Sequence, residues 1–188
     1  IRGSGHAEYI AQKLSEDDSI WRISGWHKNM RDMQVGGKGD DTGWGVYEES
    51  RKGGAIIATA HEHSYSRTYL LSSMENKTIV NKSDTLHITK GHSFVFVSGI
   101  AGKSIRDQER DGEWWASVYT STQNANYGAL FGIFNLNGNN NLAEFYFKDI
   151  DGNIADKFWV VSQVKEGSVA DHTPPAPPTN VRVVIGGE

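Results

Sequence analysis

A continuous run of small and apolar residues, Ala55-Ile56-Ile57-Ala58-Thr59-Ala60, follows the pair Gly53-Gly54 in this 188-residue chain. A strand with one face in water alternates apolar and polar residues, whereas a continuous apolar run indicates a strand that is buried on both faces. Such a strand has to be covered by other elements on each side of its sheet. The run therefore predicts a layered fold with this strand inside it.

The sequence up to about residue 162 predicts a mixture of helices and strands, with strands in the majority. Apolar residues at helical spacing predict helices over residues 6–14 and 44–51, and Gly53-Gly54 end the second helix. The Gly- and Asp-rich segment 31–43 predicts a loop. Strands are predicted over residues 20–26, 55–60, 78–80, 85–88, 93–99, 129–135, 142–148 and 157–161. The fold class is therefore α/β (α+β) and β-rich.

The position of the prolines predicts where the domain ends. All four prolines lie between residues 174 and 178, so residues 171–178 predict a stiff, extended linker after a domain that spans residues 1–170. In residues 179–188, apolar and polar side chains alternate as in a β-strand, and the segment resembles the start of a fibronectin type III module. A disordered tail is the other interpretation of this segment. Because the chain begins with Ile1 and not with methionine, we expect it to be a fragment of a longer protein.

Composition and charge exclude several classes of site and partner. A formal net charge of −4 argues against a non-specific nucleic-acid binder, which carries a basic surface. No apolar run is long enough to span a membrane. The sequence contains no cysteine, which excludes disulfides, zinc–thiolate sites and thiol nucleophiles. Any metal ion must therefore be held by His, Asp, Glu, Asn or Tyr side chains.

Histidines follow two of the predicted strands. His61 and His63 come directly after the buried run, and His27 follows the strand at residues 20–26. In an extended chain, residues i and i+2 point to the same side, so we expect His61 and His63 to lie together. Open α/β sheets place their sites at the carboxyl ends of strands, and neutral imidazole is the commonest ligand of transition metals. The three histidines therefore predict a metal site.

Two other interpretations of the chemistry-bearing residues stay open. Because three imidazoles form a sound zinc site, His27, His61 and His63 alone would suit a single-zinc hydrolase. A cluster of aromatic residues would suit either sugar stacking in a binding module or ordinary core packing: Trp114, Trp115 and Tyr119.

Four segments resemble the calcineurin-like metallophosphoesterases, and in particular their purple acid phosphatase branch. Residues 53–68, with Ala60-His61-Glu62-His63 near their centre, are similar to the family's last metal-binding motif, Gly-His-x-His. Trp26-His27-Lys28 resembles the preceding motif, in which a strand ends in a metal-binding histidine. Gly99-Ile100-Ala101-Gly102 and residues 145–158 are similar to the glycine-rich turn and the terminal hairpin of that branch.

This resemblance implies the C-terminal half of a four-layer αββα sandwich and a metal-dependent phosphoesterase activity. It implies that His27 and His61 bind one metal ion and that His63 binds a second, the ions being divalent or trivalent Fe, Mn or Zn. It implies that Tyr65 and Arg67 lie near the phosphate of a phosphomonoester or phosphodiester substrate. The implied reaction is in-line attack on phosphorus by a hydroxide that the two metal ions activate.

The sequence departs from the family pattern at several points. Ala60 stands in place of glycine, Ser66 stands in place of the usual acidic residue, and the family's N-terminal motifs (Asp-x-His, Gly-Asp and Gly-Asn-His) are absent. We therefore expect this chain to supply only histidine ligands, to be inactive alone, and to need the N-terminal half of the same protein as its partner. The alternative is a non-catalytic, phosphoesterase-like binding module of a secreted multidomain protein. The proline-rich linker favours an extracellular or periplasmic location in bacteria.

Overall fold

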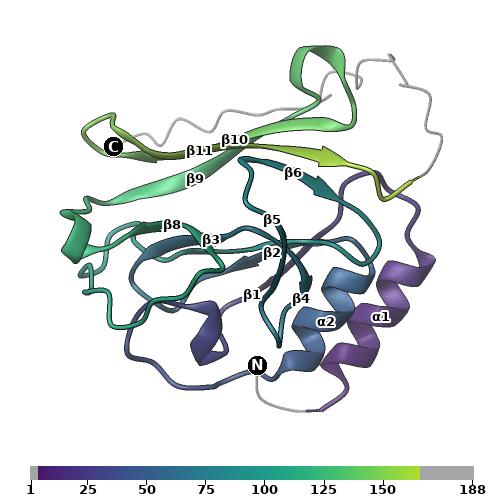
Figure 1. Ribbon diagram of the computed structural model, residues 1–188, viewed down its shortest axis with the longest axis horizontal. Helices are drawn as coiled ribbons and strands as arrows, with labels where there is room; N and C mark the ends of the chain where they lie inside the picture. Colours follow the sequence, from purple (N-terminus) through teal and green to yellow (C-terminus); the bar gives the residue numbers. More distant parts are fainter. Residues whose placement is uncertain (1–3, 166–188) are drawn as a thin grey trace, which may run out of the picture.

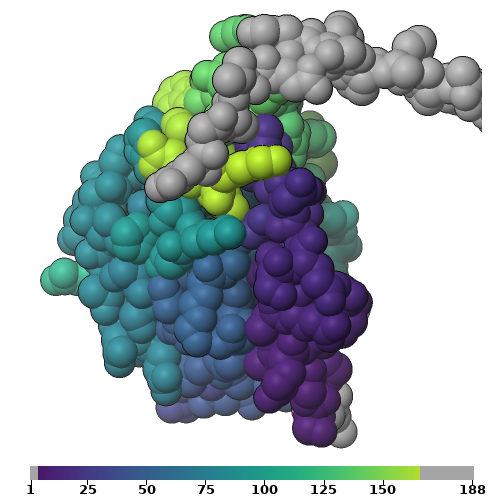
Figure 2. All heavy atoms as spheres, turned by 90° about the vertical axis from the view of Figure 1, so that its right-hand side faces the viewer, coloured from purple at the N-terminus to yellow at the C-terminus, as the bar shows by residue number. Residues whose placement is uncertain are grey.

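The computed structural model describes residues 4–165, which form three layers (Figure 1). In this part of the chain, two α-helices, α1 (His6–Glu16) and α2 (Trp44–Lys52), lie on one face of a five-stranded sheet. A four-stranded sheet covers the opposite face. The surface of α1 lies directly beside that of α2 (Figure 2), so the two helices form a single layer.

The two larger sheets differ in how their strands run. The five-stranded sheet is mixed and contains, in spatial order, β1 (Ile23–Trp26), β2 (Ile56–Thr59), β7 (Val95–Ser98), β3 (Tyr65–Thr68) and β8 (Trp115–Tyr119). The four-stranded sheet is mainly antiparallel and contains β6 (Thr85–Ile88), β11 (Ile154–Ser162), β10 (Leu142–Asp149) and β9 (Gly128–Phe134). The smaller elements are the pair β4 (Leu70–Ser73) and β5 (Thr78–Asn81) and the 3-10 helices Arg31–Met33, Ser121–Gln123 and Leu136–Gly138.

Strand β2 is buried on both faces, as the apolar run predicts. Ile56 packs into the core between the two sheets, together with Phe158. The next residue, Ile57, points to the other face and packs with Tyr47 of α2 in the core beneath the helices. β2 also pairs in parallel with β1 on one side and with β7 on the other. The strand that leads to His61 is therefore held in place on all sides.

Both predicted helices and all the predicted strands are present, so the α+β fold class is confirmed. Strands β3, β4 and β8 are present as well, although the sequence does not predict them. Among these, β3 is a fully buried strand between β7 and β8, although its sequence is largely polar. Arg67 can be buried there because it pairs with Asp156, whereas the buried hydroxyl of Ser66 has no hydrogen-bond partner among the described residues.

Some sequence predictions concern parts of the chain beyond residue 165. The linker over residues 171–178, the possible strand over residues 179–188 and the end of the predicted domain all lie outside the described residues. Within the described range, no helix is both long and apolar enough to cross a membrane.

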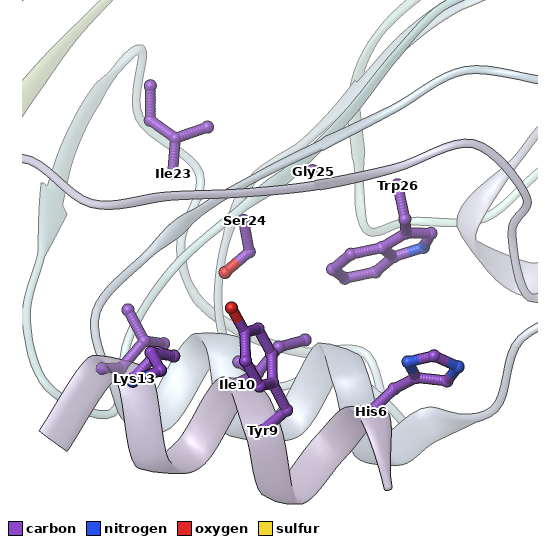
Figure 3. A pocket seen from close by; sticks show the side chains of 9 residues that line it. His6, Tyr9, Ile10, Lys13, Ile23, Ser24, Gly25 and Trp26 are labelled. Atoms are coloured by element: carbon purple, nitrogen blue, oxygen red, sulfur yellow. The ribbon is translucent and has the colours of Figure 1, made fainter. Parts of the chain in front are cut away.

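A groove of about 480 Å³ lies between α1 and β1 (Figure 3). Tyr9 and Lys13 line it from the helix, and Ser24 and Trp26 line it from the strand. β1 is an edge strand, since β2 is its only strand partner among the described residues. None of the three predicted metal ligands lines this groove, so it is separate from the site described next.

Candidate metal centre

His27 and His61 meet at the edge of the five-stranded sheet where its parallel strands end. β1, β2 and β7 run in the same direction, and Trp26 of β1 pairs in register with Thr59 of β2. His27 follows Trp26 directly, and His61 follows Thr59 by two residues. As a result, Nε2 of His27 lies 3.0 Å from Nδ1 of His61. The fold thus brings two of the three predicted ligands together at the carboxyl ends of neighbouring strands, where α/β sheets commonly place sites.

A left-handed turn at His61 ends the straight course of the chain after β2. The φ angle of His61 is 64°, which is uncommon for a residue with a Cβ atom. The carbonyl of Ala60 accepts hydrogen bonds from the N–H of Glu62 (2.8 Å) and from the side-chain amide of Asn29 (2.7 Å). The carbonyl of His61 accepts one from the ammonium of Lys38 (2.7 Å). The chain is therefore not extended from His61 to His63, which removes the basis for expecting the two histidines of the His-x-His motif to point the same way.

His63 lies apart from the histidine pair. Its N–H donates to Oε1 of Glu62 (3.1 Å), and its carbonyl accepts from the N–H of Arg106 (3.0 Å). Its Nδ1 is buried and has no hydrogen-bond partner among the described residues. Residues 4–165 contain no group of three or more His, Asp or Glu side chains placed to hold one metal ion. The three histidines therefore do not form the single-zinc site that the sequence leaves open.

Glu62, between the two histidines of the motif, is fully buried and packs against two glycines. Its Oε1 accepts from the guanidinium of Arg106 (3.1 Å), whereas its Oε2 has no partner in the described part of the chain. A Cβ atom at Gly36 would lie 2.2 Å from the carboxyl carbon of Glu62, and one at Gly99 would lie 1.9 Å from its carbonyl oxygen. Glycine is therefore required at both positions for the chain to approach Glu62 this closely.

Replacing Gly99 with alanine is expected to lower the free energy of unfolding by about 2–3 kcal/mol, because the backbone of Glu62 has to move to admit the new methyl group. Gly39→Ala is the matched control, since a Cβ atom there meets nothing within 4 Å; its effect should stay below about 0.5 kcal/mol. Urea unfolding measures both variants. Equal stability of the two variants would contradict the close packing of Gly99 on Glu62.

Two lysines, Lys28 and Lys38, lie close enough for their charges to act on His61, and Arg106 acts in turn on Lys38. The pKa of His61 is lowered, mainly by burial and next by the positive charge of Lys38. A lowered pKa keeps the imidazole neutral at physiological pH, and the neutral ring is the form that binds a metal ion. The charges around His61 therefore favour its function as a ligand.

The loop that carries Lys38 is held against the site by a second loop. The N–H groups of Glu109 and Arg110 both donate to the carbonyl of Val35, at 2.8 and 3.0 Å. The guanidinium of Arg110 also donates to the carbonyl of Lys38 at 2.7 Å. Sequence reasoning missed this loop as part of the site. The available signal was Gly36-Gly37-Lys38-Gly39, in which three glycines surround one lysine.

Tyr65 and Arg67, which the resemblance implies near phosphate, point into the protein. Both side chains on β3 bind Asp156 on β11: the Tyr65 hydroxyl donates at 2.6 Å and Nε of Arg67 donates at 2.7 Å. Arg67 is 1% exposed, and its guanidinium lies 4.1 Å from the centre of the Phe158 ring. Burial and the charge of Asp156 raise the pKa of Tyr65, which keeps its hydroxyl protonated. These contacts join the two sheets and give no support to a contact with phosphate.

The aromatic residues considered for sugar binding are engaged inside the protein. Nε1 of Trp114 donates to the carbonyl of Asp32 at 3.0 Å, and Trp115 is buried. The hydroxyl of Tyr119 donates to Asp149 at 3.1 Å. Core packing therefore accounts for these three side chains, and the sugar-binding interpretation loses its main support.

Comparison with solved structures shows which known fold the chain has. It superposes on a purple acid phosphatase isolated from yellow lupin (Lupinus luteus) seeds, with a TM-score of 0.68 over 97% of this chain. The chain has a metallophosphoesterase-like fold. The two sequences are 15% identical, and the match spans 32% of the lupin protein, so the likeness concerns the fold alone and about a third of that chain. The sequence matches no protein-family profile and no curated protein.

The separation of the two histidine rings is compatible with two ligands on one ion. Two imidazole nitrogens that each lie about 2.1 Å from a metal ion are about 3.0 Å apart at an octahedral angle of about 90° and about 3.4 Å apart at a tetrahedral angle. The observed separation is 3.0 Å, which also suits a hydrogen bond between the rings. Residues 4–165 supply no carboxylate or third imidazole to the same point. The pair therefore fits part of a metal site, and further ligands are needed to complete it.

Proposed function

We propose that this chain is part of a metal-dependent phosphoesterase, to which it contributes histidine ligands. The observation that carries the proposal is the pair His27–His61, whose ring nitrogens lie 3.0 Å apart at adjacent strand ends of a metallophosphoesterase-like fold. Neither the pairing nor the fold alone would identify a phosphoesterase, because unrelated functions share folds and histidines often form hydrogen bonds. Together they support the proposal, because α/β sheets commonly bind ligands at the carboxyl ends of their strands.

In this proposal the histidines divide between two metal ions of the Fe, Mn or Zn type. His27 and His61 bind one ion, and His63, which lies apart with its Nδ1 unpartnered in the described range, binds the other. Asn29 and Lys38 hold the carbonyls of Ala60 and His61, and so fix the turn that aims the His61 ring. When bound, the two ions would lower the pKa of a water molecule and neutralise charge on the phosphoryl oxygens of a phosphomonoester or phosphodiester.

The remaining ligands, on this proposal, come from a segment that precedes this one in a longer protein. The described residues lack the third ligand that the His27–His61 pair needs, and the chain spans about a third of the phosphatase that it resembles in fold. Because a metal ion with only two protein ligands is weakly held, we expect this chain alone to be inactive.

The test compares the longer protein with the 188-residue chain. The longer protein is expected to bind two metal ions by elemental analysis and to hydrolyse p-nitrophenyl phosphate or bis(p-nitrophenyl) phosphate when Mn²⁺ or Zn²⁺ is supplied. Removal of metal with a chelator should abolish turnover, and readdition should restore it. The 188-residue chain serves as the inactive control.

The outcomes separate the two functions that the sequence leaves open. Absence of both bound metal and turnover in the longer protein would refute the proposal. Specific binding of a phosphoester without turnover would favour the non-catalytic binding module instead.

A further inference from the structure

Lys38 lies beside the histidine pair and has no carboxylate partner of its own among residues 4–165. The charges of Glu62 and Asp41 both act on it, but Glu62 forms its ion pair with Arg106. Asp41 likewise pairs with a different lysine, Lys28, at 3.3 Å. Within residues 4–165, the ammonium of Lys38 is fixed instead by a neutral acceptor, the carbonyl of His61. A lysine ammonium has three N–H donors, so this single contact leaves two of them for another partner.

The position of Lys38 relative to the histidines is fixed by contacts on both sides of its loop. Gly36 packs against the buried carboxylate of Glu62, with no room for a side chain. On the other side, the guanidinium of Arg110 donates to the carbonyl of Lys38, and the backbone N–H of Arg110 donates to the carbonyl of Val35. The ammonium is therefore held at the site rather than carried on a free surface side chain, and a charge held in position binds an anion at lower entropic cost.

Positive charges that lie close together repel one another, and an anion bound between them reduces this repulsion. Lys28, Lys38 and Arg106 bring three positive charges to the region of the histidine pair, where two carboxylates are already paired. Metal ions at the histidines would add more positive charge. An anion of high charge density beside Lys38 would offset these positive charges.

We propose that Lys38 binds the phosphoryl group of the substrate and that it favours dianionic phosphomonoesters over monoanionic phosphodiesters. This inference rests on the proposed function. Lysine binds phosphate as a point charge through charge-assisted hydrogen bonds, and a dianion gains about twice the Coulomb energy of a monoanion at the same distance. Lys38 takes the phosphate contact for which Tyr65 and Arg67, bound to Asp156 between the sheets, are not positioned.

The experiment titrates the metal-free 188-residue chain with inorganic phosphate in the presence of a chelator, and follows backbone amide signals by NMR. Saturable shifts are expected at residues 36–39 and 61–63. Lys38→Met should raise the Kd for phosphate by about tenfold, the loss of one charged hydrogen bond. Lys38→Gln, which keeps a donor for the carbonyl of His61 but removes the charge, should weaken binding similarly, and Lys38→Arg should restore most of it. Lys90→Met is the matched control, because Lys90 is exposed in the turn that precedes β7, remote from the carboxyl ends of the strands.

Dimethyl phosphate in place of inorganic phosphate measures the preference for a dianion, and it should bind more weakly and respond less to Lys38→Met. The proposal is overturned if wild-type protein shows no saturable phosphate shifts at these residues, or if Lys38→Gln binds phosphate as tightly as wild type. Because the titration contains no metal ion, its failure leaves metal-dependent turnover of the longer protein standing. Conversely, absence of turnover with intact phosphate binding would refute the proposed function and retain the anion site.

Discussion

His61→Ala in the longer protein is expected to lower kcat for a chromogenic phosphomonoester by at least about 100-fold. His61 supplies one of the two ring nitrogens that lie 3.0 Å apart at the strand ends, and in the proposed metal site its loss would leave His27 without its partner ligand. Loss of a group that only orients a metal ligand already costs about 10–100-fold in metal affinity or activity. Loss of the ligand itself should cost more, and bound metal, measured by elemental analysis, should fall with kcat.

The matched control is His87→Ala, which removes an exposed imidazole from β6 in the other sheet. This variant should keep both its metal content and its kcat. If His61→Ala also kept both, His61 would not be a ligand, and the histidine pair would be no more than a hydrogen bond between two rings.

Asp156→Ala is expected to reduce the free energy of unfolding by about 3–5 kcal/mol, which is the usual cost of leaving a buried charge without its partner. The Arg67 side chain is 1% exposed, and that of Asp156 is 7% exposed. Asp156 accepts two hydrogen bonds from Arg67 and one from Tyr65. Its removal leaves the guanidinium of Arg67 without its buried partner between the two sheets. Urea unfolding of the 188-residue chain measures the change in the free energy of unfolding.

Asp84→Ala provides the comparison, because Asp84 contacts the same guanidinium at 3.0 Å from a side chain that is 66% exposed. An exposed ion pair contributes about 0–1 kcal/mol, so this variant should remain close to wild type. An equal decrease in the free energy of unfolding for the two variants would show that the ion pair with Asp156 stabilises the protein no more than the exposed one with Asp84. An increase in stability in Asp156→Ala would show that Arg67 finds water when its partner is gone.

The sequence predicts the fold best where one local pattern decides the outcome. The apolar run at residues 55–60 can be buried only inside a layered fold, and β2 is buried on both faces. His27 and His61 follow from the same reasoning, because the ends of neighbouring parallel strands meet at one edge. The sequence alone shows that each of these two strands is followed by a histidine, so the site can be predicted before it is known that β1 and β2 pair.

Strand β3 and the loop around Lys38 could not be predicted in this way, because their structure depends on partners far along the chain. The polar residues Tyr65 and Arg67 give no sign of a buried strand until Asp156 of β11 is known to lie beside them. The position of Lys38 depends on Arg110, whose guanidinium reaches across from a separate loop. Hydrophobic periodicity carries no information on such polar pairings.

Strand β1 has a further consequence for work with this chain. Beyond β1 the described residues add no strand to the five-stranded sheet, and the adjoining groove leaves Tyr9 61% and Ile23 58% exposed. An edge strand with free backbone donors and acceptors and apolar side chains is a template for pairing with another chain. Pairing of two copies at this edge would make the 188-residue chain self-associate at high concentration, so its properties as a monomer are to be measured in dilute solution.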